Sequence, residues 1–394
     1  MLKIVRLTLV CLFALSLGTP ALAYAHSPTP PWPPFCQEGS LPSHDPQYPA
    51  DQLIIVCVPP PPYWNGQLVV YAHGYVPPQV PLALPVDELT LPDGTFVPEL
   101  VLAQGYAFAT SSYHKNGYAV EQARKDLNDL VNYVKRQVRP GSLQKVFIAG
   151  ASEGGEVATM LIERYPDKYD GALALCGPIG GAPYQIQYLS DFRAVFDYFF
   201  PDVFPFGVTN VPPTEFLNWP NDVQAIARAL ALNPAATAQL FSVTGAAFDP
   251  LDPASTVTTA VGVLYYSIWG TNDLVAAANG MPYDNQSTVY YSPLVDNAAL
   301  NAGVERVQAD PRAQSYMRRY YQPTGELQRP MVTLHNTLDP AVPFQHEVIY
   351  GGLVAATGRS NFFTAFPVPT YGHCNFTADQ VLMAFAYLVQ QAGP

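Results

Sequence analysis

Hydrophobic residues follow two patterns along the chain. Continuous apolar runs, which are typical of buried strands, occupy residues 52–58, 66–71, 106–110, 146–149, 171–176, 331–334 and 362–368. Apolar residues at helical spacing occupy residues 99–103, 120–138, 156–165, 345–356 and 377–391. Strands that alternate with helices favour a mostly parallel α/β sheet flanked by helices. The first two runs flank a proline-rich turn, which predicts a strand pair at an edge of the sheet.

The pattern changes between residues 177 and 328. This segment contains a stretch dense in Phe and Tyr, an Ala-rich helical stretch at 221–240, an apolar stretch at 260–269 and a polar loop at 280–292. We therefore predict a catalytic core formed by residues 26–176 and 329–394. Residues 177–328 are predicted to form a mainly helical lid insertion over the carboxyl edge of the sheet. For the aromatic residues themselves, an interior core of the insertion is the favoured interpretation.

Residues 1–25 have the organisation of a secretory signal peptide. Lys3 and Arg6 precede an apolar run at 7–17, and small residues at the end offer cleavage sites. The run is too short to cross a membrane, and no later segment reaches about 18 uninterrupted apolar residues, so we predict no stable membrane span. The sequence therefore predicts a secreted protein, either extracellular or periplasmic.

Composition restricts the class of protein further. The chain has 394 residues, of which 49% are hydrophobic and 13% charged, so it can bury one large core with an insertion. Its net charge of −12 disfavours nucleic acid as a partner, and loss of Lys3 and Arg6 with the signal peptide would make it more acidic. The sequence leaves the oligomeric state open.

Four cysteines remain after the predicted signal peptide: Cys36, Cys57, Cys176 and Cys374. An even number in an oxidising compartment favours two disulfides, for which three connectivities exist. Cys36 and Cys57 flank one proline-rich loop, which favours pairing them and leaves Cys176 with Cys374. A metal site is the weaker alternative, because the chain has no CxxC or HxxxH spacing.

A glycine-flanked serine follows the run at 146–149. The sequence Gly150-Ala151-Ser152-Glu153-Gly154 leads from a predicted strand into a predicted helix. Glycines two residues before and after the serine allow a sharp turn that exposes its Oγ. Such five-residue patterns also occur by chance, but the strand and helix around this one favour a nucleophile turn.

A serine nucleophile needs a histidine to take its proton and a carboxylate to orient that histidine. Asp339 follows one late predicted strand and His373 follows the last, so Ser152, Asp339 and His373 occur in the order Ser, acid, His. We predict that they form a catalytic triad. Taken singly, Asp339 also fits an Asp-Pro turn, and His373 fits a surface loop.

Other residues compete for the base and acid roles. His346 lies inside a predicted helix, His335 is too near Asp339, and His114 precedes the nucleophile. Asp273 is the second candidate for the acid, since residues 265–269 before it fit a strand.

Two backbone N–H groups should stabilise the oxyanion that forms on the attacked carbonyl. The residue after the nucleophile, Glu153, should supply one of them. The loop His73-Gly74-Tyr75, after an early strand, should supply the other from Tyr75 and also contact substrate. A plain turn is the alternative interpretation of His73 and Gly74.

At these residues the chain resembles the α/β-hydrolase superfamily, from about residue 52 to the end apart from the insertion. The resemblance implies an eight-stranded, mostly parallel sheet, acyl-enzyme catalysis and no cofactor. Within the superfamily the chain is most similar to secreted bacterial esterases and lipases, including polyester and feruloyl esterases. Tannase-like enzymes of that group bridge a cysteine beside the nucleophile to one beside the histidine. Cys374 matches the second, but Ala151 occupies the first position, and Cys176 is placed to anchor the His373 loop instead.

We therefore expect a secreted serine hydrolase that cleaves carboxylic esters, acting on small-molecule or polymeric substrates with apolar or aromatic parts. The first alternative is a serine aminopeptidase or dipeptidase of the same fold. The second is a binding protein on an inactive hydrolase scaffold, which an intact triad disfavours.

Overall fold

The computed structural model describes residues 32–139 and 141–393. The predicted signal peptide, residues 1–25, lies outside these ranges. Within them, no helix has both the length and the apolar character needed to cross a membrane.

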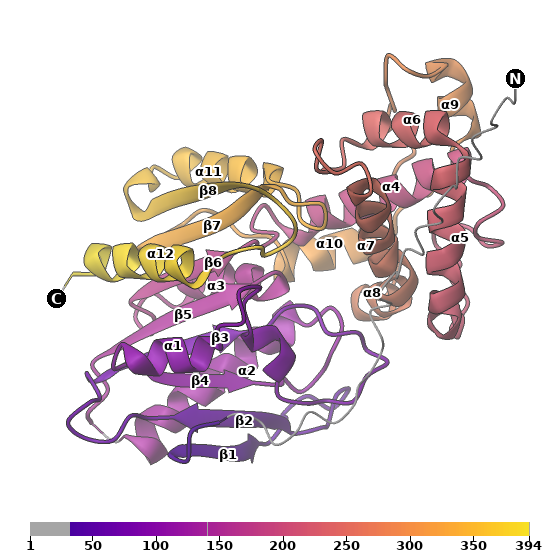
Figure 1. Ribbon diagram of the computed structural model, residues 1–394. Coiled ribbons are helices and arrows are strands. Elements are labelled where there is room, and N and C mark those ends of the chain that lie inside the picture. Colours follow the sequence, from indigo (N-terminus) through magenta and orange to yellow (C-terminus); the bar gives the residue numbers. More distant parts are fainter. Residues whose placement is uncertain (1–31, 140, 394) are drawn as a thin grey trace, which may run out of the picture. The chain divides into compact units, whose positions relative to one another are not determined.

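One eight-stranded sheet forms the centre of the described chain, with the strand order β1-β2-β4-β3-β5-β6-β7-β8 (Figure 1). β1 is antiparallel to β2 and β2 is antiparallel to β4, whereas every later neighbouring pair is parallel. The prediction of a mostly parallel sheet is confirmed. The strands are β1 (Cys36–Leu41), β2 (Gln52–Cys57), β3 (Gln67–Ala72), β4 (Ala107–Ser111), β5 (Lys145–Ala151), β6 (Gly171–Leu175), β7 (Met331–Leu338) and β8 (Phe363–Tyr371).

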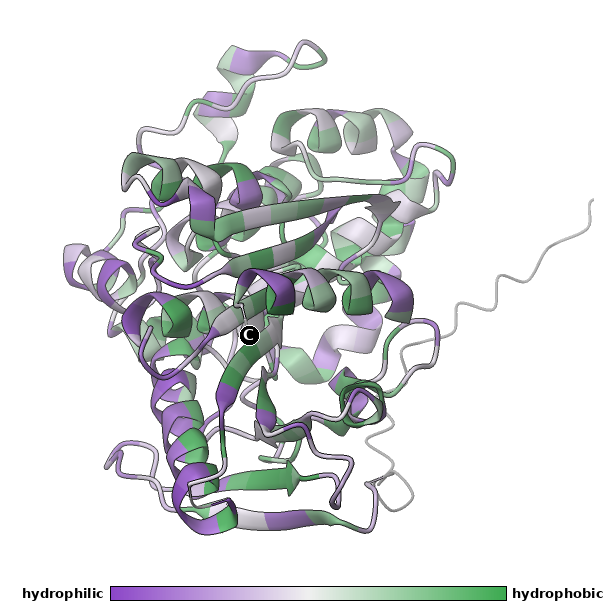
Figure 2. Cartoon of the chain, turned by 90° about the vertical axis from the view of Figure 1, so that its left-hand side faces the viewer, coloured by the Kyte–Doolittle hydropathy of each residue, from purple (hydrophilic) through white to green (hydrophobic). Residues whose placement is uncertain are grey.

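Helices cover both faces of this sheet. Alternate side chains of β5 enter different cores: Val146 and Ile148 pack with the helices α2, α3 and α11, whereas Phe147 and Ala149 pack with α1 and α12. In Figure 2 the central strands are coloured mostly as hydrophobic, as expected for a sheet buried on both faces. The five helices are α1 (Val97–Ala103), α2 (Val120–Tyr133), α3 (Glu153–Arg164), α11 (Gln345–Ala356) and α12 (Ala378–Gln391).

Between β6 and β7 the chain forms helices only. Figure 1 shows them grouped together on one side of the sheet, where α4 packs against α6, α7 and α10. Their arrangement agrees with a helical insertion, and its role as a lid remains a prediction. The helices are α4 (Ala182–Phe199), α5 (Trp219–Leu232), α6 (Pro234–Thr244), α7 (Ser255–Trp269), α8 (Thr271–Ala278), α9 (Asn297–Gly303) and α10 (Pro311–Tyr320).

Two local predictions are wrong. β2 and β3 do not pair at the edge, because β4 lies between them and β3 is a central strand. Residues 265–269 belong to helix α7 rather than to a strand, so helical packing decides the conformation of this apolar run. The Ala-rich stretch at 221–240 is helical, as predicted, and it is divided into two helices because Pro234 begins the second and cannot continue the first.

Candidate active site

Ser152 lies at a strained turn between β5 and α3. Its φ of 56° and ψ of −127° are outside the regions that a non-glycine residue normally adopts. Such a conformation persists only where the surrounding structure imposes it, and it is common at functional sites. The backbone of this turn is held in part by the Ser152 N–H, which donates to the Leu175 carbonyl of β6 at 2.9 Å.

The glycines around Ser152 are required by close backbone approach. A Cβ on Gly154 would lie 2.0 Å from the Ala72 carbonyl oxygen, and one on Gly150 would lie 2.1 Å from the Gly154 carbonyl oxygen. Both contacts are with backbone, which cannot move aside as a flexible side chain can. The glycine pattern in the sequence therefore reflects the packing of α3 against β3 and β5.

Ser152, His373 and Asp339 form one hydrogen-bonded chain. His373 Nε2 lies 2.9 Å from Ser152 Oγ, and His373 Nδ1 lies 2.7 Å from Asp339 Oδ2. Asp339 is buried, and its Oδ1 accepts the N–H groups of Ala341 and Val342 at 2.9 Å each. In this geometry Nδ1–H donates to the carboxylate, which leaves the Nε2 lone pair free to accept the serine proton.

Parallel strands explain why residues so distant in sequence meet. Ser152 follows β5, Asp339 follows β7 and His373 lies just beyond β8. Because the carboxyl ends of parallel strands share one edge of a sheet, the three residues gather at that edge. The structure thus brings together all three residues of the predicted triad, while their catalytic role remains a proposal.

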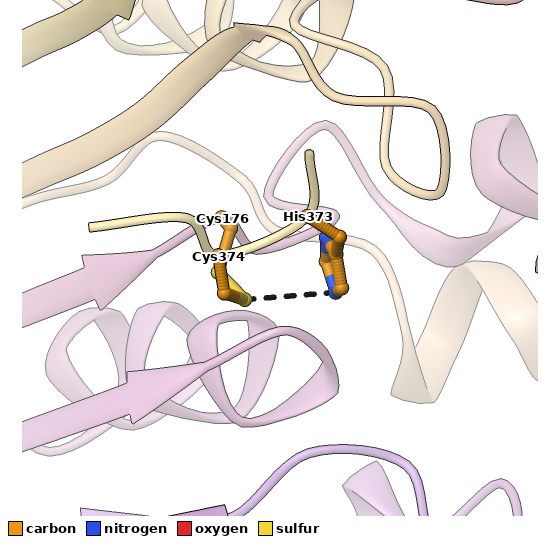
Figure 3. Close-up of side chains that lie close together, drawn as sticks. All are labelled: Cys176, His373 and Cys374. Atoms are coloured by element: carbon orange, nitrogen blue, oxygen red, sulfur yellow. Dashed lines mark hydrogen bonds between the residues drawn. A yellow bond between two sulfur atoms is a disulfide. The ribbon is translucent and has the colours of Figure 1, made fainter. Parts of the chain in front are cut away.

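A disulfide anchors the loop that carries His373. Cys374 is bonded to Cys176, which directly follows β6, and Figure 3 shows both cysteines beside the His373 side chain. The other bridge joins Cys36 to Cys57 between β1 and β2. Both bridges are those that the sequence favoured.

The Cys176, Cys374 and His373 side chains also satisfy a simple distance criterion for a metal site. Their donor atoms lie within 4.8 Å of one another. Both sulfur atoms, however, belong to the disulfide, and metals bind cysteine as the thiolate. The group is therefore a covalent anchor beside an imidazole, and its donor set does not fit a metal.

The predicted oxyanion donors belong to Glu153, which follows Ser152 in the chain, and to the loop of Gly74 and Tyr75, which packs against Ser152. Glu153 is the first residue of α3, so its N–H has no acceptor within the helix. Gly74 packs so closely that a Cβ on it would lie 3.2 Å from Ser152 Cβ. Tyr75 follows, with its ring packed edge-on against Tyr118 and Tyr266. The loop position fits the predicted role of Tyr75, which remains a proposal.

The His73 ring supports this loop from inside. It is 2% exposed, stacks on Tyr113 with ring centroids 3.8 Å apart, and its Nδ1–H donates to the Gly74 carbonyl at 2.7 Å. Burial lowers the pKa of His73 to about 4, so the ring is neutral. Any contact of His73 with substrate would come from its backbone, and its predicted substrate-binding role is untested.

Sequence reasoning missed Glu88, which contacts the same loop. Its Oε2 accepts the Gly74 N–H at 2.7 Å. Desolvation of the carboxyl group raises its pKa, while the residue as a whole is exposed to solvent. Oε2 and Ser152 Cβ both lie 3.2 Å from the place of a Cβ on Gly74, so they are separated by at most twice that distance. Glu88 lies in a proline-rich connection without a recognisable motif, so no signal marked it.

The competing histidines and acid have other partners. His114 pairs with Asp126, His335 with Glu347, and Asp273 with Lys115. His346 accepts the Gly180 N–H at 3.0 Å. Each of these interactions supports the core or the insertion, and none of the four residues hydrogen-bonds to Ser152 within the described ranges.

Comparison with known proteins agrees with this geometry. Residues 111–277, which include the Ser152 turn, match the family model described as serine aminopeptidase, S33. Together with the sheet order and the nucleophile turn, this match supports an α/β-hydrolase fold for the chain. No curated protein shows significant similarity to the chain.

Several solved structures are similar at low sequence identity. An acylaminoacyl peptidase from Pyrococcus horikoshii is 8% identical with a TM-score of 0.44, over 90% of this chain and 41% of that one. Est1E from Butyrivibrio proteoclasticus is 11% identical with a TM-score of 0.41, over 90% and 100%. A Pyrococcus furiosus esterase is 12% identical with a TM-score of 0.44, over 91% of each chain. The chain thus spans only 41% of the length of the peptidase.

Proposed function

We propose that the protein is a secreted serine hydrolase that cleaves carboxylic esters through an acyl-enzyme. The observation that carries this proposal is the hydrogen-bonded chain from Ser152 through His373 to Asp339, at the strained turn of an α/β-hydrolase. A serine hydroxyl is a weak nucleophile, and this arrangement supplies the base and the group that orients it.

Acylation begins when Ser152 Oγ attacks the ester carbonyl while His373 Nε2 takes the hydroxyl proton. Asp339 stabilises the resulting imidazolium, and the N–H groups of Glu153 and Tyr75 stabilise the oxyanion. His373 then donates the proton to the alcohol oxygen as the carbon–oxygen bond breaks, which leaves the acyl group on Ser152.

Deacylation repeats these steps with water. His373 removes a proton from the water as its oxygen attacks the acyl carbonyl, and the same N–H groups stabilise the second oxyanion. His373 returns the proton to Ser152 Oγ, and the acid is released.

The proposal also includes secretion and a substrate class. The two disulfides favour an oxidising compartment and therefore agree with secretion. Tyr266 of α7 contacts Tyr75, so the aromatic insertion packs against the loop that carries a proposed oxyanion donor. This contact supports a role of the insertion as a lid. The lid would favour substrates with apolar or aromatic parts, including polyesters.

A serine aminopeptidase is the second candidate. The matched family model carries that description, and Glu88 places a carboxylate close to Ser152. A carboxylate in this position could pair with the free amine of a peptide substrate.

Hydrolysis assays separate the two candidates. The purified protein should hydrolyse p-nitrophenyl butyrate, show little activity on aminoacyl p-nitroanilides, and react with a fluorophosphonate at Ser152. The variant Ser152→Ala should abolish both hydrolysis and labelling. Higher kcat/KM on aminoacyl anilides than on simple esters would favour the aminopeptidase, and absence of labelling in a folded sample would contradict both candidates.

A further inference from the structure

An apolar cavity of about 110 Å³ lies between the sheet and the two helices α1 and α12. Val69 of β3, Ala149 of β5 and Leu173 of β6 form its floor. Val101 of α1 and Phe385 of α12 contribute to the opposite wall. The cavity therefore lies on the sheet face away from α2 and α3.

One end of this cavity adjoins the candidate active site. Ala151, which precedes Ser152, and Cys374, which follows His373, both line it. Glu88, whose carboxylate accepts the Gly74 N–H, lines the same end. Ala149 lies two residues further back on β5 than Ala151, and a strand rises about 3.3 Å per residue. The cavity thus runs from the reactive edge of the sheet into its interior.

We propose that this cavity binds the unbranched alkyl chain of the ester that Ser152 attacks. The inference rests on the proposed ester hydrolase function and specifies its substrate. Most of the lining side chains are hydrocarbon, so the cavity stabilises a ligand with few polar groups. Its position places the chain within covalent reach of the carbonyl held between Ser152 and the oxyanion donors.

The volume limits what can enter. A cavity of about 150 Å³ in another protein accommodates one benzene, and a water-sized group occupies about 30 Å³. A volume of about 110 Å³ therefore has room for roughly four methylene-sized groups, and a substituted aromatic ring would not fit. Aromatic parts of a substrate would have to lie elsewhere, for example against the insertion.

The test is the dependence of kcat/KM on chain length in two series. The first series varies the acyl chain of p-nitrophenyl esters from acetate to decanoate, and the second varies the alcohol of acetate esters from ethyl to octyl. In the series whose chain enters the cavity, kcat/KM should rise roughly fourfold per methylene for about four methylenes and then level off. The series that responds shows whether the acyl or the alcohol part binds.

The variant Val101→Phe should fill part of the cavity. It should lower the ratio of long-chain to short-chain kcat/KM at least tenfold in the responsive series. This ratio is independent of the fraction of folded enzyme, since both substrates are cleaved by the same molecules. The matched control is Val348→Phe, because Val348 is 58% exposed on α11 and lies outside the cavity lining, so its ratio should equal that of the wild type.

The outcomes distinguish the assignment of the cavity from the ester hydrolase function on which it rests. Ester hydrolysis with no chain-length dependence in either series, or an unchanged ratio in Val101→Phe, would overturn the cavity assignment and leave the ester hydrolase intact. Failure of the wild type to hydrolyse any ester of either series would overturn both.

Discussion

Cys374 and Cys176 form a covalent bond between the loop that carries His373 and the end of β6. Both residues have positive φ angles, 52° and 46°, as does Ser152 on the neighbouring strand end. Positive φ angles are uncommon for residues other than glycine. The bridge therefore holds the imidazole loop in a conformation that the free chain would rarely adopt.

Removing this bridge should impair catalysis as well as stability. In the double variant Cys176→Ser with Cys374→Ser, we expect kcat/KM for p-nitrophenyl butyrate to fall at least tenfold, because a loosened loop misplaces His373 Nε2 relative to Ser152. The free energy of unfolding should fall by roughly 2 to 5 kcal/mol. Ester hydrolysis and thermal unfolding of the purified variant measure the two effects.

The second disulfide provides a matched control. Cys36 and Cys57 face each other across β1 and β2, at the edge of the sheet opposite to β7 and β8, which lead to Asp339 and His373. The variant Cys36→Ser with Cys57→Ser should lower the melting temperature but retain kcat/KM when measured well below it. Equal activity losses in the two double variants would show that the Cys176–Cys374 bridge has no particular role in positioning His373.

Asp339→Asn should abolish most activity while preserving the fold. Asn Oδ1 can still accept the N–H groups of Ala341 and Val342, which leaves Nδ2–H facing His373 Nδ1. The imidazole must then present a lone pair at Nδ1 and carry its proton on Nε2, where it cannot accept the Ser152 proton. We expect kcat to fall by about 10² to 10⁴ with little change in melting temperature.

Asp273→Asn is the appropriate comparison, because Asp273 was the other acid candidate. Its carboxylate accepts from Lys115 and from the Tyr118 N–H, and it therefore ties α8 to the loop after β4. This variant should change stability more than kcat. A larger loss of kcat in Asp273→Asn than in Asp339→Asn would reject the assignment of the acid.

The sequence was sufficient to predict where the candidate site residues lie, because the local pattern and the chemistry agreed at those positions. The Ser152 turn combines a local glycine requirement with a buried strand, and Asp339 and His373 follow strands whose apolar runs are continuous. Their meeting at one edge follows from parallel pairing alone. These features were predictable because each depends on a few neighbouring residues and on a general property of sheets.

Features that depend on non-local contacts were not predictable. β1 has an exposed, polar sequence, and it forms because it pairs with β2 at an edge and is bridged to it by Cys36–Cys57. The placement of β4 between β2 and β3 depends on long-range pairing that adjacent apolar runs do not encode. Glu88 reaches the Gly74 loop through the path of an irregular connection, which carries no periodicity.

Gly154→Ala should unfold or inactivate the protein. The added Cβ would lie 2.0 Å from the Ala72 carbonyl oxygen and 2.7 Å from that of His73, so α3 would have to move away from β3. Such a movement displaces both Ser152 and the oxyanion loop, and we expect a loss of stability of about 3 kcal/mol or more, with activity undetectable.

Gly352→Ala is the control for Gly154→Ala. Gly352 lies inside α11, and no heavy atom lies within 4 Å of the place of its Cβ. Alanine there should stabilise the helix by roughly 0.5 to 1 kcal/mol, as measured by denaturant unfolding. A stability near that of the wild type in Gly154→Ala would mean that α3 and β3 do not pack as closely as described.

Glu153→Gln should change how stability depends on pH. The Glu153 side chain is 8% exposed and its Oε1 accepts the Ala119 N–H at 2.9 Å. Burial raises the pKa of this carboxyl group to about 8, whereas an unfolded glutamate titrates near 4.3. Between these two pH values the folded protein retains a proton that the unfolded chain releases. The contribution of this group to the free energy of unfolding is therefore full below about pH 4.3 and is lost as the pH rises towards 8.

Glutamine is neutral at every pH and can keep the Ala119 hydrogen bond, while the backbone N–H of residue 153 stays in place for the oxyanion. We expect Glu153→Gln to be more stable than the wild type at pH 8 by roughly 2 kcal/mol and to differ much less at pH 5. Urea unfolding at the two pH values measures this, with the exposed Glu326→Gln as control. An equal effect of Glu153→Gln at both pH values would show that Glu153 is already ionised in the folded protein at pH 5.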